Sequence, residues 1–161
     1  MHRTKIILLS FFTLVTIFSA NAQKKKATTS KKTIIKKSEL PVLKTYLGAY
    51  SDTATVSAQE LFKLIDSPIR VTDKQNNLYT ITYYQFLYKR RVMSEDETTG
   101  KPFPTTSMIS DNFKATPLPK VWIDNIRQDI KPGEEMLFFD IIVKDSKGVV
   151  MYAPNLKIFT K

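Results

Sequence analysis

The feature that most constrains the fold is a long run of β-branched and aromatic residues in the middle of the chain. Residues 78–92 read Leu-Tyr-Thr-Ile-Thr-Tyr-Tyr-Gln-Phe-Leu-Tyr-Lys-Arg-Arg-Val, and neither Gly nor Pro interrupts them. This composition favours a β-strand. Alternation places Tyr79, Ile81 and Tyr83 on one face and Tyr84 and Phe86 on the other. Since both faces carry apolar side chains, we expect a strand inside a sandwich rather than an isolated hairpin.

Shorter segments on either side predict further strands. Each combines β-branched or aromatic residues with turn residues at its ends, such as the Asp-Ser-Lys-Gly turn at residues 145–148. The predicted strands lie at residues 45–56 (broken near Gly48), 69–73, 136–144, 149–152 and 156–160.

Two short helices are predicted between these strands. Ser57-Ala58-Gln59-Glu60 fits a capping box, in which the Ser hydroxyl accepts from the Glu60 amide and the Glu60 carboxylate reaches back. That helix runs to about Asp66 and stops before Pro68. Pro117 opens the second helix, whose apolar positions recur every four residues up to the breaker pair Pro-Gly. Trp122 lies on this apolar stripe and is expected in the core.

Residues 94–112 are acidic and then rich in Thr, Pro and Ser, which predicts a long exposed loop. The elements together indicate a mainly β (α+β) domain at residues 45–161. The expected architecture is a small antiparallel immunoglobulin-like β-sandwich with two short helical insertions. A parallel α/β sheet is disfavoured, because strands and helices do not alternate regularly.

Residues 1–22 have the three parts of a secretory signal. A positive start precedes an apolar run at residues 6–18, and Ala-Asn-Ala at residues 20–22 fits the cleavage site. As a helix the apolar run spans about 20 Å, short of the roughly 30 Å hydrocarbon core of a membrane. We therefore expect a cleaved signal and an exported protein of the periplasm. A retained anchor is the alternative, and the cell surface or the medium are alternative destinations.

Most of the positive charge lies in an arm at residues 23–44. This segment carries eight lysines and one acid, a net charge of +7, whereas residues 45–161 carry only +1. Its low apolar content predicts disorder. The arm is either a solvated linker or an attachment to anionic lipid or polysaccharide. Nucleic acid is not expected, since no aromatic residues alternate with the lysines. The arm lysines are Lys24, Lys25, Lys26, Lys31, Lys32, Lys36, Lys37 and Lys44.

Composition excludes several classes of chemistry. The single His is His2, inside the expected signal, and the chain has no Cys. A mature chain would therefore have no Cys/His or Ser/His nucleophile, no thiolate or imidazole metal site and no disulfide. The four glycines form no phosphate-binding loop. We expect no enzyme and no cofactor; a hydrolase built on two convergent carboxylates is the enzymatic alternative.

Three acidic features are candidates for chemistry. Residues 95–97, Glu-Asp-Glu, fit no EF-hand spacing and predict a solvated loop rather than a Ca²⁺ site. Glu134 and Glu135 are adjacent, so their carboxylates are expected to point apart. Asp140 lies within a predicted strand and is expected to be partly buried against an Arg or Lys.

Two further groups of residues each allow two interpretations. Lys89, Arg90 and Arg91 close the predicted central strand, where they either grip an acidic protein or a phosphate-bearing glycan, or protect a sheet edge from aggregation. The tyrosines of the central strand either stack on a sugar or peptide, or fill the core with their hydroxyls at its rim. These tyrosines are Tyr79, Tyr83, Tyr84 and Tyr88.

The C-terminal third has a recognisable order of motifs. Leu-x2-Val-Trp-Ile-x2-Ile is followed by a Pro-Gly-Glu turn, a strand ending Phe-Asp-Ile-Ile-Val, an Asp-x-x-Gly hairpin and a final Pro-x-Leu-x-Ile strand. This order resembles the last periplasmic domain of the gliding-motility M protein family, which forms the shaft of the type IX secretion and gliding motor. The helix start at residues 57–61 and the strand pair at residues 69–88 resemble the front half of that domain.

The resemblance implies a free-standing copy of that terminal domain. Family members also carry a helical stalk, other domains and a membrane anchor, where this chain has a signal and a Lys-rich arm. The family supplies no catalytic residues to transfer. We expect a non-enzymatic module that binds an envelope protein, of the gliding or type IX machinery, through a sheet edge or residues 94–112. The alternative is a polyanion- or surface-tethering protein that acts through the arm.

Overall fold

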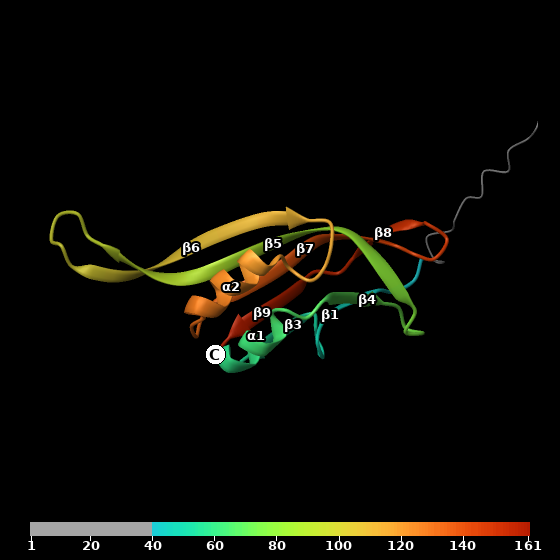
Figure 1. Cartoon of the computed structure of the whole chain (residues 1–161), viewed down its shortest axis with the longest axis horizontal. Coiled ribbons are helices and arrows are strands. Elements are labelled where there is room, and N and C mark those ends of the chain that lie inside the picture. The colour runs from blue at the N-terminus through green and yellow to red at the C-terminus, as the bar shows by residue number, and fades with distance from the viewer. Residues whose placement is uncertain (1–39) are drawn as a thin grey trace, which may run out of the picture. The chain divides into compact units, whose positions relative to one another are not determined.

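The computed structural model describes residues 40–161, and Figure 1 labels its helices and strands. The expected signal at residues 1–22 lies outside the described residues, and so do seven arm lysines. These seven are Lys24, Lys25, Lys26, Lys31, Lys32, Lys36 and Lys37. Lys44, the last lysine of the expected arm, is the first residue of strand β1.

Strands dominate the described part of the chain, which also has two short helices. This confirms the expected mainly β class with two helical insertions. The elements are β1 (Lys44–Leu47), β2 (Tyr50–Ser51), β3 (Thr53–Val56), α1 (Ala58–Leu64), β4 (Ile69–Thr72), β5 (Leu78–Glu95), β6 (Pro102–Phe113), α2 (Lys120–Asp129), β7 (Glu135–Lys144), β8 (Val150–Ala153) and β9 (Leu156–Thr160).

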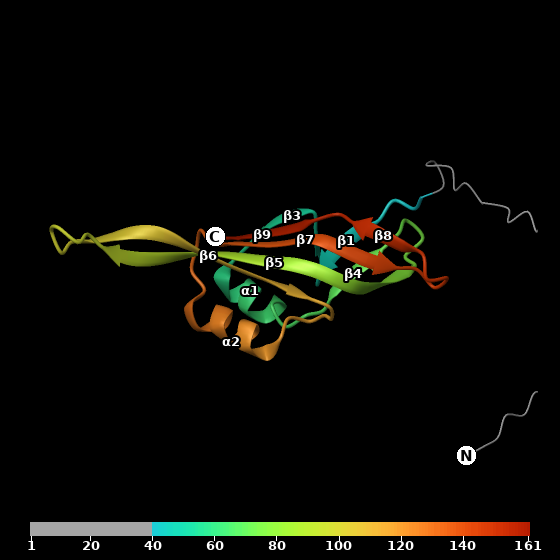
Figure 2. The ribbon, with the colours of Figure 1, turned by 90° about the horizontal axis from the view of Figure 1, so that it is seen from above.

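The strands form one mixed sheet that curls into a barrel-like sandwich. Its order is β2-β1-β4-β5-β7-β9-β3, with β6 added to β5 and β8 added to β7. The pairs are antiparallel, as expected, except that β3 runs parallel to β9. A parallel pair needs a long connection between its strands. Here almost the whole domain provides it, since β3 comes early in the chain and β9 is the last strand (Figures 1 and 2).

Helix α1 begins where the capping motif predicts. The Ser57 hydroxyl accepts from the Glu60 amide at 3.1 Å, which satisfies one free N–H of the first turn. The expected return contact of the Glu60 carboxylate is wrong. That carboxylate instead accepts from the Tyr50 hydroxyl of β2 and ties the helix to the sheet.

Helix α2 begins at Lys120, so the expected start at Pro117 is wrong. The residue before a proline is disfavoured in the helical region, and Leu118 precedes Pro119. Leu118 is therefore kept out of the helix, and Pro119, with an extended ψ of 146°, is the N-cap. Leu118 is buried just before the helix, and Ile123 and Ile126 bury its inner face.

An aromatic cluster between α2 and the sheet forms the centre of the core. Tyr84 and Phe86 of β5 and Phe138 of β7 are almost fully buried. Trp122 of α2 meets the ring of Phe86 edge-on at 5.5 Å, and that of Phe113 of β6 at 5.8 Å. The expected core position of Trp122 is confirmed. Edge-to-face pairs of this kind stabilise the core beyond the area they bury.

The regular alternation of side-chain faces expected along β5 is wrong, because the pairing of β5 with β7 is irregular. The register shifts between Ile81 and Tyr83 and again between Tyr83 and Gln85. As a result Ile81 packs against the same core as Tyr84. A β-bulge exchanges the faces of a strand in this way. On the opposite strand Asp140 has a positive φ of 48°, so the irregularity involves both strands.

The expectation of a loop at residues 94–112 is also wrong. Strand β5 continues to Glu95, and β6 pairs with it from Pro102 to Phe113, opposite Glu95 and Tyr84. Proline is tolerated in a strand at the edge of a sheet, and β6 is such an edge. Thr105, Thr106 and Ile109 along the rest of β6 are residue types favoured in strands. The result is a long hairpin, whose outer part projects from the sandwich in Figures 1 and 2.

Candidate protein-binding ribbon

The outer part of this hairpin, residues 90–107, is called the ribbon here. The pairing of β5 with β7 ends at Lys89 and Glu135. Beyond that point β5 pairs only with β6 among the described residues. The ribbon is therefore a two-stranded structure with no third strand or helix along most of its length. Two-stranded hairpins are marginal on their own in water, so this segment gains from contact with another surface.

Lys89, Arg90 and Arg91 lie at the base of the ribbon and not at the end of a strand, as the sequence suggested. They do not form one cluster. Successive residues of a strand alternate between its faces, so Lys89 and Arg91 share one face and Arg90 lies on the other. None of the three takes part in an ion pair within residues 40–161. The Nε atom of Arg90 is buried without a hydrogen-bond partner in that part of the chain.

A buried carboxylate fixes the base of the ribbon. Glu134 is only 1 % exposed, and it accepts from the Tyr88 hydroxyl. It also accepts from the Arg91 amide at 3.2 Å and the Lys131 amide at 3.1 Å. Burial is the main cause that raises the pKa of Tyr88, and the hydrogen bond to Glu134 adds to it. The carboxylate thus joins β5 to the loop before β7.

The same loop is tied to the last strand. The Thr160 hydroxyl donates to the Lys131 carbonyl at 2.5 Å and accepts from the Glu134 amide at 2.8 Å. Gly133 in this loop has a φ of +84°, and a Cβ there would lie 3.2 Å from the Arg91 side chain. The loop therefore passes very close to the ribbon base, where only glycine fits without strain.

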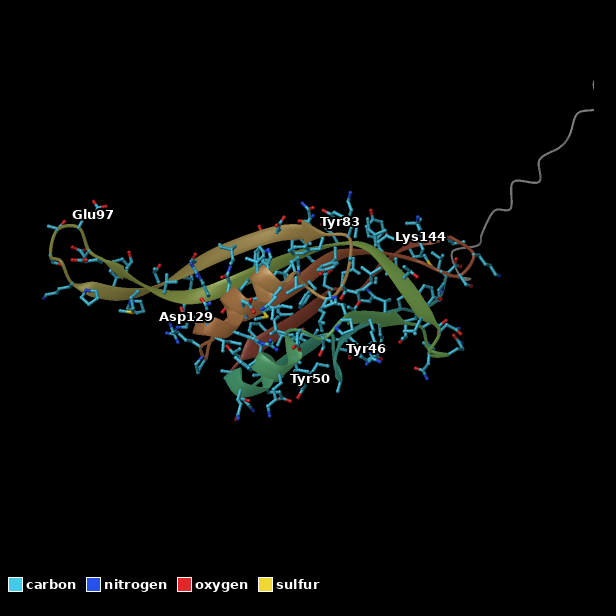
Figure 3. All side chains as sticks on the ribbon, in the orientation of Figure 1. Tyr46, Tyr50, Tyr83, Glu97, Asp129 and Lys144 are labelled. Atoms are coloured by element: carbon cyan, nitrogen blue, oxygen red, sulfur yellow. The ribbon has the colours of Figure 1, made fainter. Side chains whose placement is uncertain are left out.

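The Glu-Asp-Glu sequence at residues 95–97 lies at the tip of the ribbon, and all three residues are exposed. The Asp96 carboxylate accepts from the amides of Thr98 at 3.0 Å and Thr99 at 2.7 Å, so it shapes the turn. The Thr99 amide contributes most to lowering the pKa of Asp96. Figure 3 shows Glu97 at the tip, far from Asp129 at the end of α2. Within residues 40–161 no three acidic residues are grouped to hold a metal ion.

Apolar side chains between the basic base and the acidic tip are exposed to solvent. Met93 is 66 % exposed and Phe103 45 %. Beside Met93 lies a groove of about 450 Å³ whose walls come from β5, β6 and the loop before β7. The groove is lined by Arg91, Val92, Met93, Pro104, Lys131 and Pro132. Met93 lies opposite Pro104 and Phe103 lies opposite Ser94, so the two exposed side chains are on opposite faces of the ribbon. Exposed apolar groups with a charged border are typical of protein-binding surfaces.

The other candidate residues are explained by packing. Tyr84 and Tyr88 are buried, which excludes both from a stacking surface, and Tyr79 donates to the Asp73 carboxylate. Glu134 and Glu135 do point apart, since Glu134 is buried and Glu135 pairs with Lys157 at 2.8 Å. The expected burial of Asp140 is wrong. Its place in the irregular part of β7 exposes it, and its carboxylate accepts from the side-chain Nε2 of Gln85 at 3.0 Å.

Sequence reasoning missed the apolar residues of the ribbon and the buried role of Glu134. A usable signal was present for the ribbon. Val92 and Met93 on one side and Phe103 on the other flank a turn that contains Gly100, as in a hairpin. No such signal exists for Glu134, because its burial depends on Tyr88 and Thr160 from distant parts of the chain.

No protein-family model and no curated protein sequence matches the chain. Neither of the two helices in the described part is long and apolar enough to cross a membrane.

Proposed function

We propose that this protein is an exported, non-enzymatic protein-binding module of the bacterial cell envelope, and that it binds through the ribbon. Support comes from the exposed Met93 and Phe103 on a segment that the rest of the described chain does not cover. The base supports the same proposal, because Glu134 accepts from the Arg91 amide of the ribbon and its own amide donates to Thr160 of β9. A preorganised surface binds at a smaller entropic cost.

The cellular setting is a separate part of the proposal. Export rests on the signal-like residues 1–22, and a place near the gliding or type IX machinery rests on the resemblance of residues 45–161. The arm offers a second route of attachment, through the +7 charge of residues 23–44. Such attachment would weaken steeply with salt, whereas binding through apolar side chains would not.

The test is a capture experiment with envelope extract at low and high salt. It compares the exported protein with two variants. In the first, an Asn-Gly turn replaces residues 93–104 and joins Val92 to Thr105, a pair already opposite in the hairpin. In the second, residues 24–37 are deleted. We expect an envelope protein that is retained at high salt by the intact chain and the arm-deleted chain, and is lost with the shortened ribbon.

Point variants separate the surface from the fold. The double substitution Met93→Asp and Phe103→Asp should weaken the affinity for the captured partner about thirtyfold. Truncating a central apolar anchor of an interface costs about 2 kcal/mol. Tyr152→Asp is the matched control, since Tyr152 is 75 % exposed on β8. Equal retention by the intact and ribbon-shortened chains would overturn the proposal. Retention only at low salt and only with the arm would assign the activity to the lysines.

A further inference from the structure

We propose that a second copy of this chain binds to the outer edge of β6, so that the two β6 strands pair antiparallel around a two-fold axis at Met108. The axis is perpendicular to the sheet, and the sheet continues from one copy into the other. Each residue of β6 faces the residue of the second copy that lies equally far from Met108 on its other side. This inference rests on the proposed function, because it names a partner for the same ribbon.

The outer edge of β6 has no neighbouring strand. β6 pairs only with β5 among the described residues. In a non-hydrogen-bonded antiparallel pair, the N–H and C=O groups of both residues point away from the opposite strand. Arg91 and Thr106 form such a pair, because the Arg91 amide donates to the Glu134 carboxylate and not to β6. The N–H and C=O groups of Thr106 therefore point outward, away from β5.

Every second residue of β6 shares this outward direction. Met108 and Ser110 have the same parity as Thr106, so each adds an N–H and a C=O group to the free edge. Within residues 40–161 these outward groups form no backbone hydrogen bond outside the sheet. With Met108 at the axis, Thr106 faces Ser110 of the second copy, and the two Met108 residues face each other. Each opposite pair can exchange two hydrogen bonds.

Both ends of this free edge are blocked, and the proposed register brings the two blocked ends together. Pro104 has no N–H, and proline protects a sheet edge from pairing. The Asn112 amide already donates to the Asp111 carboxylate at 2.7 Å. With Met108 at the axis, Pro104 of each copy faces Asn112 of the other. The pairing therefore leaves out only groups that are unable to pair.

The side chains along the free edge do not repel those of a second copy. Residues 102–110 carry no charge, whereas exposed sheet edges are commonly protected by charged side chains. Asp111, the first charged residue after them, faces Thr105 of the second copy. The Met108 side chains are 66 % exposed in a single copy and meet at the axis. No like charges lie directly opposite each other in this register.

The same register gives the exposed Phe103 an aromatic neighbour. Phe103 has the parity of Ile109 and Phe113, which pack against the core, so it lies on the α2 side of β6. It faces Phe113 of the second copy, and Phe113 meets Trp122 of α2 edge-on at 5.8 Å. Figures 1 and 2 both show α2 next to this part of β6. Aromatic pairs across neighbouring strands stabilise a sheet, and this one would cover a ring that is 45 % exposed in a single copy.

Disulfide trapping tests the register directly, because the chain has no Cys of its own. Two residues opposite each other in a hydrogen-bonded antiparallel pair have Cα atoms about 5.5 Å apart, which suits a disulfide. We expect Met108→Cys to form a disulfide-linked dimer of the exported protein under mild oxidation. Met93→Cys is the matched control, with the same residue type, the same 66 % exposure and a position on β5. Equal cross-linking at both positions, or none at Met108→Cys, would overturn the proposal.

A proline on the free edge tests the pairing without a disulfide. Thr106→Pro removes one outward N–H from each copy and leaves the pairing of β6 with β5 intact, as Pro104 does in the natural chain. Sedimentation should show about thirtyfold weaker self-association, since two hydrogen bonds per dimer are lost. Thr106→Ala is the matched control, because it keeps the N–H and should associate like the intact chain. Circular dichroism checks that both variants fold. Equal association of the two variants would contradict the pairing.

The outcome also separates this inference from the proposed function. If the intact chain stays monomeric while the ribbon still retains an envelope protein at high salt, the second-copy inference fails and the binding module stands. If the dimer forms through β6 and no other protein is retained, the ribbon is a self-association element, and the proposal of an envelope partner fails.

Discussion

Glu134 is the residue on which the candidate surface most depends. Its buried carboxylate accepts from the Tyr88 hydroxyl and from the amides of Arg91 and Lys131, so it joins β5 to the loop before β7. A buried acceptor with three donors stabilises a fold chiefly because removing it leaves those donors without partners. The geometry of the ribbon base thus depends on a residue that is itself buried.

We expect Glu134→Gln to lower the free energy of unfolding by about 2–4 kcal/mol, because the amide NH₂ replaces an acceptor with a donor. Urea denaturation measures this loss. Glu135→Gln is the control, and breaking its pair with Lys157 should cost less than about 1 kcal/mol. Equal losses for the two variants would show that Glu134 does not hold the ribbon base.

The buried tyrosines make the fold sensitive to alkali. Burial raises the pKa of both Tyr84 and Tyr88 above the ordinary value of 10.0. Their contribution to stability is complete below pH 10 and is lost as the pH rises further, because the unfolded chain then binds fewer protons than the folded chain. Urea titrations between pH 8 and 11 should show this decline. Tyr84→Phe should make the decline less steep, by close to 1.4 kcal/mol per pH unit only at the alkaline end near pH 11, where the unfolded tyrosine has lost its proton. An unchanged slope there would contradict this account.

At the scale of elements, the sequence predicted the sandwich well and the hairpin badly. Residues 78–92 and 136–144 have the composition of strands, and Ser57 marks the start of α1, so local signals were sufficient there. Residues 102–113 carry Pro102, Pro104, Ser107, Ser110, Asp111 and Asn112, which are residue types typical of loops. Pairing with β5 overrides that local preference. The faces of β5 could not be predicted, because the irregular pairing with β7 is a property of two strands together.

The ribbon should be separable from the sandwich. The ribbon residues beyond Val92 contribute no buried side chain to the core. We therefore expect the chain with an Asn-Gly turn in place of residues 93–104 to keep its melting temperature within a few degrees. Circular dichroism on heating measures it. In the intact chain, hydrogen exchange should be faster at the Met93 and Phe103 amides than at Phe138 of β7. A drop in melting temperature of about 10 °C or more would mean that the ribbon belongs to the core.

At the scale of the whole molecule, the net charge and the candidate binding surface lie in different segments of the chain. The arm at residues 23–44 carries a net +7, and residues 45–161 are nearly neutral. Within the described residues the ribbon is the segment that projects from the sandwich (Figure 2). A segment that projects from the sandwich in this way suits contact with another chain.

Deleting residues 24–37 should change attachment to anionic vesicles and leave the ribbon unaffected. Each lysine near an anionic membrane contributes roughly 1 kcal/mol, and salt screens this attraction. Vesicle sedimentation with and without phosphatidylglycerol, at low and high salt, measures the effect. We expect the deleted chain to lose low-salt binding and to keep its melting temperature. Binding that survives the deletion would place the cationic site elsewhere.

The central claim is that the ribbon is the surface that contacts another protein, and photo-cross-linking in intact cells tests it most directly. A photoreactive residue is placed at Met93 or Phe103 of the ribbon, and in a control chain at Tyr152, which is more exposed than either. We predict cross-linked protein products from both ribbon positions and none from Tyr152. Products from Tyr152 alone, with the ribbon positions unlinked, would contradict the account.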